Sequence, residues 1–90
     1  MNIGTGRLVL ITWLDACSIA SRGNWTDKDE LDKAEIQSCK SVGWVHRETD
    51  DHVVLFAHDA GDQCGGDFCI PKCCITHVQY LAIADLAVVQ

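Results

Sequence analysis

The chain has 90 residues, a length that fits one small domain. Because 48% of its residues are hydrophobic, the composition excludes a disordered chain. A net charge of −6 argues against a protein that grips phosphate backbones, so we expect no nucleic-acid partner. Within this single domain, residues 8–81 are the expected core region and residues 82–90 form an apolar tail.

The first strongly apolar stretch reads RLVLITWLDAC and comes close to a lipoprotein cleavage box. Asp15 is out of place in such a box and the apolar run is short, so a β-strand explains residues 8–14 better. No stretch reaches the length of a membrane-spanning helix. We therefore expect no membrane partner, and a reducing cytoplasm in which disulfides are rare.

The polar stretch after this strand lacks alternation and predicts a short helix. Thr26 or Asp27 could cap it, and it would run through Leu31 and Ala34. Acidic side chains crowd its first turn, which favours a solvent-exposed face over an acidic docking patch.

Two strand-like runs, CKSVGWVHRE and HVVLFAH, predict an antiparallel hairpin. Residues 49–51, which read TDD, would form its loop. A three-residue loop places Val45 opposite Leu55 and Trp44 opposite Phe56. Both faces of the hairpin would then carry large apolar side chains.

After a glycine-rich loop, GDFCI predicts a fourth strand that stops at Pro71, because proline cannot donate to a ladder. PKCC then predicts a tight turn and ITHVQYL a fifth strand. The tail, residues 82–90, fits a helix or a strand, and the pattern leaves both open. This order predicts an all-β fold, namely a five-stranded SH3-like or Sm-like small barrel with a long first loop and a short C-terminal extension.

The segments ITWLDACS, SVGWVHRETDDHVVLFAH and GGDFCIPKCCITHVQYL, in this order, resemble a family of small bacteriophage-encoded proteins. Those proteins share the S-V-G-W…E-T-D-D hairpin and the I-P-K turn. The resemblance covers roughly residues 8–81. It implies the barrel, a phage origin and a place in the host cytoplasm, and it brings no catalytic residues with it.

Four of the six cysteines fall within residues 64–74, which suggests a metal site. Their spacing is not the paired C-x2-C spacing of structural zinc, although Cys64, Cys69, Cys73 and His77 could supply an alternative ligand set. We favour small buried apolar roles for Cys69 and for one of the adjacent pair that follows it. We therefore expect no metal and no cofactor.

Catalytic motifs such as G-x-S-x-G, H-E-x-x-H and the P-loop do not occur in the sequence, so we expect no enzyme. The aromatic side chains are more informative. Trp13, Trp25 and Trp44, with Phe56, are the candidate binding residues. One or two of the tryptophans should fill the core, and at least one should lie at a subunit or partner contact.

The sequence therefore predicts a non-catalytic phage accessory module that binds a host or phage protein, and that blocks a host enzyme or an antiviral system. A structural protein of the virion, and an oligomer that sequesters a small ligand or nucleotide, remain the alternatives. Apolar side chains on both faces of the first strand and the hairpin also predict self-association. A dimer through the tail or the outer face of the hairpin is the simplest form, and cover by the acidic excursion, residues 15–37, is the competing explanation.

Overall fold

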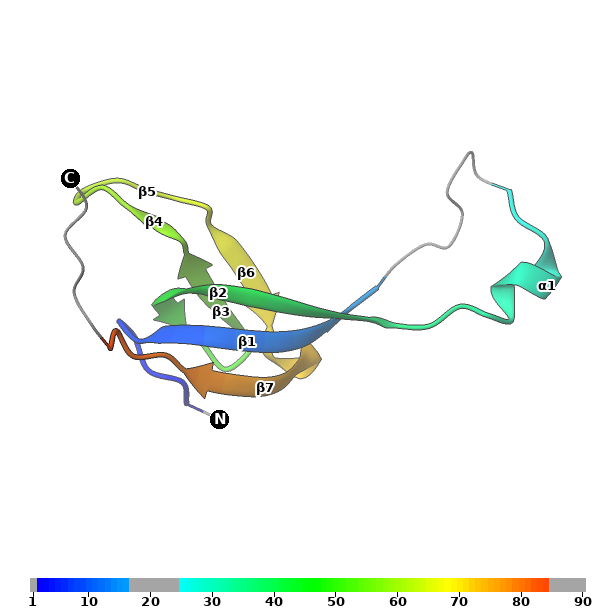
Figure 1. Cartoon of the computed structure of the whole chain (residues 1–90), viewed down its shortest axis with the longest axis horizontal. Helices are drawn as coiled ribbons and strands as arrows, with labels where there is room; N and C mark the ends of the chain where they lie inside the picture. Colours follow the sequence, from blue (N-terminus) through cyan, green and yellow to red (C-terminus); the bar gives the residue numbers. More distant parts are fainter. Residues whose placement is uncertain (1, 17–24, 85–90) are drawn as a thin grey trace.

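The computed structural model describes residues 2–16 and 25–84, and within them the all-β prediction is confirmed. The main unit is a five-stranded antiparallel sheet with the strand order β6-β3-β2-β1-β7 (Figure 1). The elements in chain order are β1 (Leu8–Asp15), α1 (Lys28–Leu31), β2 (Gln37–Glu48), β3 (His52–Phe56), β4 (His58–Asp59), β5 (Cys64–Gly65), β6 (Phe68–Pro71), the 3₁₀ helix η1 (Lys72–Cys74) and β7 (Ile75–Tyr80).

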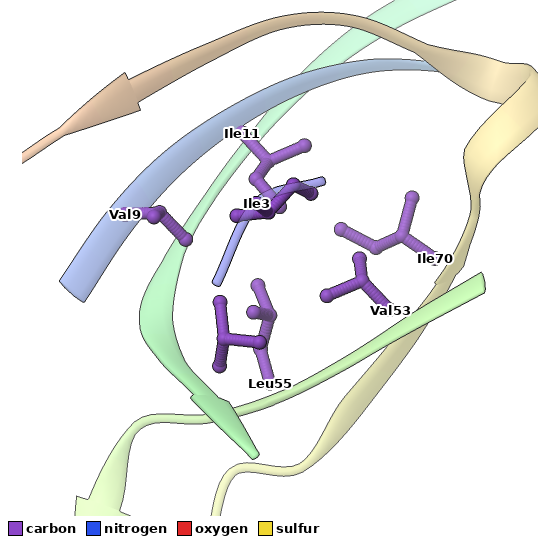
Figure 2. Close-up of a cluster of buried hydrophobic side chains, with 7 residues drawn as sticks. Ile3, Val9, Ile11, Val53, Leu55 and Ile70 are labelled. Carbon is purple, nitrogen blue, oxygen red and sulfur yellow. The ribbon is translucent and has the colours of Figure 1, made fainter. Parts of the chain in front are cut away.

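The sheet is open where the sequence predicted a closed barrel. Strands β6 and β7 are its two edges, and no ladder joins them within residues 2–16 and 25–84. The sheet nevertheless encloses a core, because the inward side chains of β1, β2, β3 and β6 pack together in one hydrophobic cluster (Figure 2). All members of this core are at most 3% exposed: Ile3, Val9, Ile11, Val45, Val53, Leu55 and Ile70.

The predicted hairpin between β2 and β3 is confirmed, with Val45 opposite Leu55 and Trp44 opposite Phe56. The Thr49 hydroxyl accepts hydrogen bonds of 3.2 Å from the backbone N–H groups of Asp51 in the loop and His52 at the start of β3, and so fixes the turn. The register shifts just after Val45, which makes a β-bulge that the sequence pattern did not predict.

Strand β6 extends one residue beyond its predicted end, because Pro71 pairs with His52 instead of stopping the strand before it. The missing N–H of Pro71 is tolerated there, since β6 is an edge strand with one neighbour. The predicted tight turn is η1, and its Lys72 N–H donates to the Asp51 carbonyl at 2.8 Å. The segment predicted as a glycine-rich loop contains the short antiparallel pair β4–β5, which the sequence pattern did not predict.

The described part of the acidic excursion does not cover the sheet. All of residues 25–38 are exposed, including Trp25 at 92% and Ile36 at 67%. Helix α1 ends at Leu31, earlier than predicted, and lies away from the sheet (Figure 1). In the described chain, no helix has the length and apolar character needed to cross a membrane.

The tail is only partly described. Residues 82–84 form no regular element, and residues 85–90 lie outside the described part of the chain. The choice between a helix and a strand for the tail is therefore a question about residues that the structure does not describe.

Candidate functional site

The face of the sheet that points away from the core carries a second row of apolar side chains. The strand register places Leu8 opposite Trp44, Leu10 opposite Val42, and Trp44 opposite Phe56. Because opposed residues of an antiparallel pair point to the same side, these pairs form one continuous row across three strands. We call this surface the outer face and define it by Leu8, Leu10, Val42, Trp44, Val54 and Phe56.

The outer face is partly accessible along its whole length. Val42 is 52% exposed, and the other members are half-buried. An antiparallel sheet with its core on one side normally alternates to polar residues on the other. Residues 25–38 leave this face uncovered, so the apolar row is available to a partner.

An aromatic hollow of about 300 Å³ opens beside the outer face. The rings of Trp44 and Phe56 lie 5.7 Å apart with a tilt of 31° between their planes. The imidazole of His46 meets the Phe56 ring edge-on at 6.1 Å. The hollow is lined by Thr5, Gly6, Trp44, Val45, His46, Phe56 and Asp59.

Backbone hydrogen bonds fix one wall of the hollow. The N–H of Gly6 donates to the Val45 carbonyl at 2.7 Å, and the N–H of Val45 donates to the Arg7 carbonyl at 2.9 Å. Gly6 has a φ of +85°, a conformation that residues with a side chain rarely adopt. The bulge that follows Val45 helps to place His46 beside Phe56.

The β4–β5 pair holds the acidic group of the hollow, Asp59. The backbone of Asp59 pairs with Cys64, and its Oδ1 accepts a 2.9 Å hydrogen bond from the Gly61 N–H. This is an Asx turn, which fixes the orientation of the carboxylate. Among the described residues, Oδ1 has this one hydrogen bond and Oδ2 has none.

The four predicted binding residues separate into different places. Trp44 and Phe56 lie together on the outer face. Trp13 packs against the core, with its ring 5.3 Å from that of Phe68 and its Nε1–H donating to the Ser41 hydroxyl at 3.0 Å. Trp25 projects from the excursion into solvent.

The alternative metal set is not assembled. In residues 2–16 and 25–84, no group of three or more potential ligand side chains comes together. The structure therefore does not assemble a metal site from the proposed set, which is Cys64, Cys69, Cys73 and His77. Cys69 is exposed, which corrects the expectation that it is a small buried hydrophobe. It occupies the opposite face of β6 from the buried Ile70.

Cys73 and Cys74 form a contact of their own, with their Sγ atoms 3.9 Å apart. This hydrogen bond raises the pKa of the Cys74 thiol, and partial burial and the Asp15 carboxylate act in the same direction. Among the described residues, no third potential ligand side chain joins this pair.

Sequence reasoning missed a buried ionic contact that organises the fold. The side chain of Glu48 is 8% exposed and its carboxylate accepts hydrogen bonds from Lys72 Nζ at 2.8 Å and from the N–H groups of Ile3 and Gly4 at 2.8–3.0 Å. Burial opposes ionisation, but these hydrogen bonds outweigh it and lower the pKa of Glu48 to about 2. No local pattern marks this contact, because it joins segments that are far apart in the sequence.

No family model, curated protein or solved structure matches the chain. The outer face and the hollow are therefore assigned from the geometry and chemistry of the chain's own residues.

Proposed function

We propose that this protein is a non-catalytic binding module that engages another protein through its outer face. The observation that carries the proposal is the row Leu8–Trp44–Phe56, which is apolar, continuous and accessible on a sheet whose other face already holds the core. Contiguous apolar patches on small proteins mark interaction sites, and tryptophan is enriched at the centres of interfaces.

A small barrel of the SH3-like or Sm-like type is the finer fold that we propose for the domain. Two features support it. The strand order places the last strand, β7, beside the first, and η1 links the two strands that form the edges of the sheet. Approach of those two edges would close the barrel and protect their unpaired backbone groups.

The biological setting that we propose depends on the interpretation of residues 8–81 as similar to bacteriophage-encoded proteins. We propose that the partner is a host or phage protein in the host cytoplasm, and that binding blocks a host enzyme or an antiviral system. The virion alternative would place many copies in purified particles, which mass spectrometry of the particles detects. The sequestering alternative would retain one nucleotide or small ligand through purification of the protein.

Capture from a host lysate tests the proposal, with variants that separate the outer face from the rest of the surface. Val42→Lys places a charge in the apolar row, while Ile36→Lys places the same charge on the excursion, and both native side chains are more than half exposed. The proposal expects one protein to be captured by the native chain and by Ile36→Lys but not by Val42→Lys. Equal capture by both variants would remove the outer face from the interaction. Circular dichroism confirms that each variant is folded.

A further inference from the structure

We propose that the aromatic hollow is a subsite for an arginine side chain of the partner protein. This inference rests on the proposed function and names the chemistry that the partner must present. The lining of the hollow includes the aromatic residues Trp44 and Phe56, whose rings lie together, and the acidic residue Asp59. A planar cation that stacks on a ring and donates hydrogen bonds at its edge satisfies both groups at once.

The aromatic wall favours a cation with a flat face. Tryptophan is the strongest of the aromatic rings for this contact, and arginine is the cation found there most often. The chain itself stacks an arginine on an aromatic ring elsewhere, because the guanidinium carbon of Arg7 lies 4.0 Å from the centre of the Tyr80 ring. Trp44 offers the same kind of surface to a side chain from outside.

The acidic group supplies the second half of the recognition. The Asx turn leaves Asp59 Oδ2 without a hydrogen-bond partner among the described residues, and holds the carboxylate in place before a ligand arrives. A preorganised carboxylate loses little conformational freedom on binding. A partner that covers the outer face also excludes water from the hollow, which strengthens a charge-assisted hydrogen bond.

The volume of the hollow and the net charge of the chain both favour a single basic side chain as the occupant. A volume of about 300 Å³ lies at the small end of ligand pockets, so the hollow suits a single side chain better than a large cofactor. The chain has a net charge of −6, and several of its few cations have intrachain contacts: Arg7 with Tyr80, Lys33 with Glu30, and Lys72 with Glu48. Charge complementarity therefore favours a basic partner segment.

A titration with N-acetyl-arginine-amide tests the subsite without knowledge of the partner. The neutral analogue N-acetyl-citrulline-amide, at matched ionic strength, has nearly the same shape. We expect the arginine compound to shift the NMR signals of the Trp44 indole N–H and of the Asp59 and Gly61 amides, and the citrulline compound to leave them almost unchanged. Equal shifts with both compounds would overturn the proposal, and equal shifts with N-acetyl-lysine-amide would overturn the assignment to arginine.

Asp59→Asn is the variant that isolates the charge, because the asparagine carbonyl can still accept the Gly61 N–H bond. We expect it to weaken arginine-amide binding about tenfold, while Asp62→Asn in the same loop has no effect. Unchanged binding by Asp59→Asn would contradict the subsite. The proposed function is judged separately by capture: if Val42→Lys loses the partner and Asp59→Asn binds it as tightly as the native chain, the module stands and the arginine subsite fails.

Discussion

Glu48 and Lys72 form an ion pair with 2.8 Å between Oε2 and Nζ, in which the two side chains are only 8% and 14% exposed. The same carboxylate accepts hydrogen bonds from the N–H groups of Ile3 and Gly4. It therefore joins the end of the hairpin, the turn η1 and the segment that carries the core residue Ile3. The hydroxyl of Tyr80 completes this attachment by donating to the Ile3 carbonyl at 2.7 Å.

Replacement of Glu48 by glutamine should destabilise the fold by about 1.5–3 kcal/mol, the range for hydrogen bonds to a charged group. Glutamine keeps one acceptor oxygen but removes the negative charge that pairs with Lys72 at 2.8 Å. Urea unfolding followed by tryptophan fluorescence measures the loss. The matched control is Glu30→Gln, whose ion pair with Lys33 is largely exposed and should contribute almost nothing. Equal losses in the two variants would show that the Glu48 contact is not special.

The contribution of the Glu48 carboxylate to the free energy of unfolding should decrease as the pH is lowered. Its pKa is lowered from 4.5 to about 2 on folding, so the unfolded chain takes up the proton first as the pH falls. The stabilisation is thus complete above the ordinary pKa and disappears as the pH falls toward 2. The unfolding free energies of the native chain and Glu48→Gln should converge between about pH 5 and pH 2. A difference that stays constant over this range would contradict the lowered pKa.

Protein purified without a chelator should contain well below one zinc per chain. The described residues bring no group of three or more potential ligand side chains together, whereas a structural zinc site needs four ligands. Elemental analysis measures the metal, and addition of EDTA should leave the thermal unfolding midpoint unchanged. Stoichiometric zinc that is lost together with the fold would contradict the account of the cysteines.

Self-association is expected at micromolar concentration, because the apolar side chains of the outer face stay partly in water in the single chain. Burying them against a second copy would stabilise the dimer by about 25 cal/mol per Å² of apolar surface. Light scattering should report more than one chain. If the second copy occupies the outer face, a bound partner should displace it. Truncation after Tyr80 and the variant Val42→Lys distinguish the two routes. Loss of the oligomer only on truncation would assign it to the tail, whereas loss only in Val42→Lys would assign it to the outer face. A native chain that is monomeric would refute self-association.

Local patterns predicted the strands well, because alternation and β-branched residues act over a few neighbours. The pairing of Trp44 with Phe56 was predicted from a three-residue loop, which would place Glu48 opposite His52. In the structure Glu48 pairs with Val53, and the bulge beside His46 shifts the ladder by one residue into the predicted pairing. Bulges were missed beside His46 and between Thr12 and Trp13, since an extra residue in a strand leaves no trace in composition.

Long-range contacts could not be predicted from local patterns, because they join segments that are far apart in the sequence. The burial of Ile3 and its hydrogen bond to Glu48 depend on a segment that folds back across the sheet. In the hollow, Asp59 joins Trp44 only because a glycine-rich loop forms the β4–β5 pair. The aromatic half of the candidate site was predicted, and its acidic half was not.

The central claim is that the protein binds another protein through the outer face. Site-specific photo-crosslinking in cells of the proposed host tests this claim most directly. A photoreactive phenylalanine analogue replaces Val42 in one version of the chain and Ile36 in the other, two exposed positions of which only the first lies on the outer face. We predict a covalent adduct with one other protein from position 42 and none from position 36. Adducts from both positions alike, or adducts at position 42 with copies of this chain only, would contradict the account.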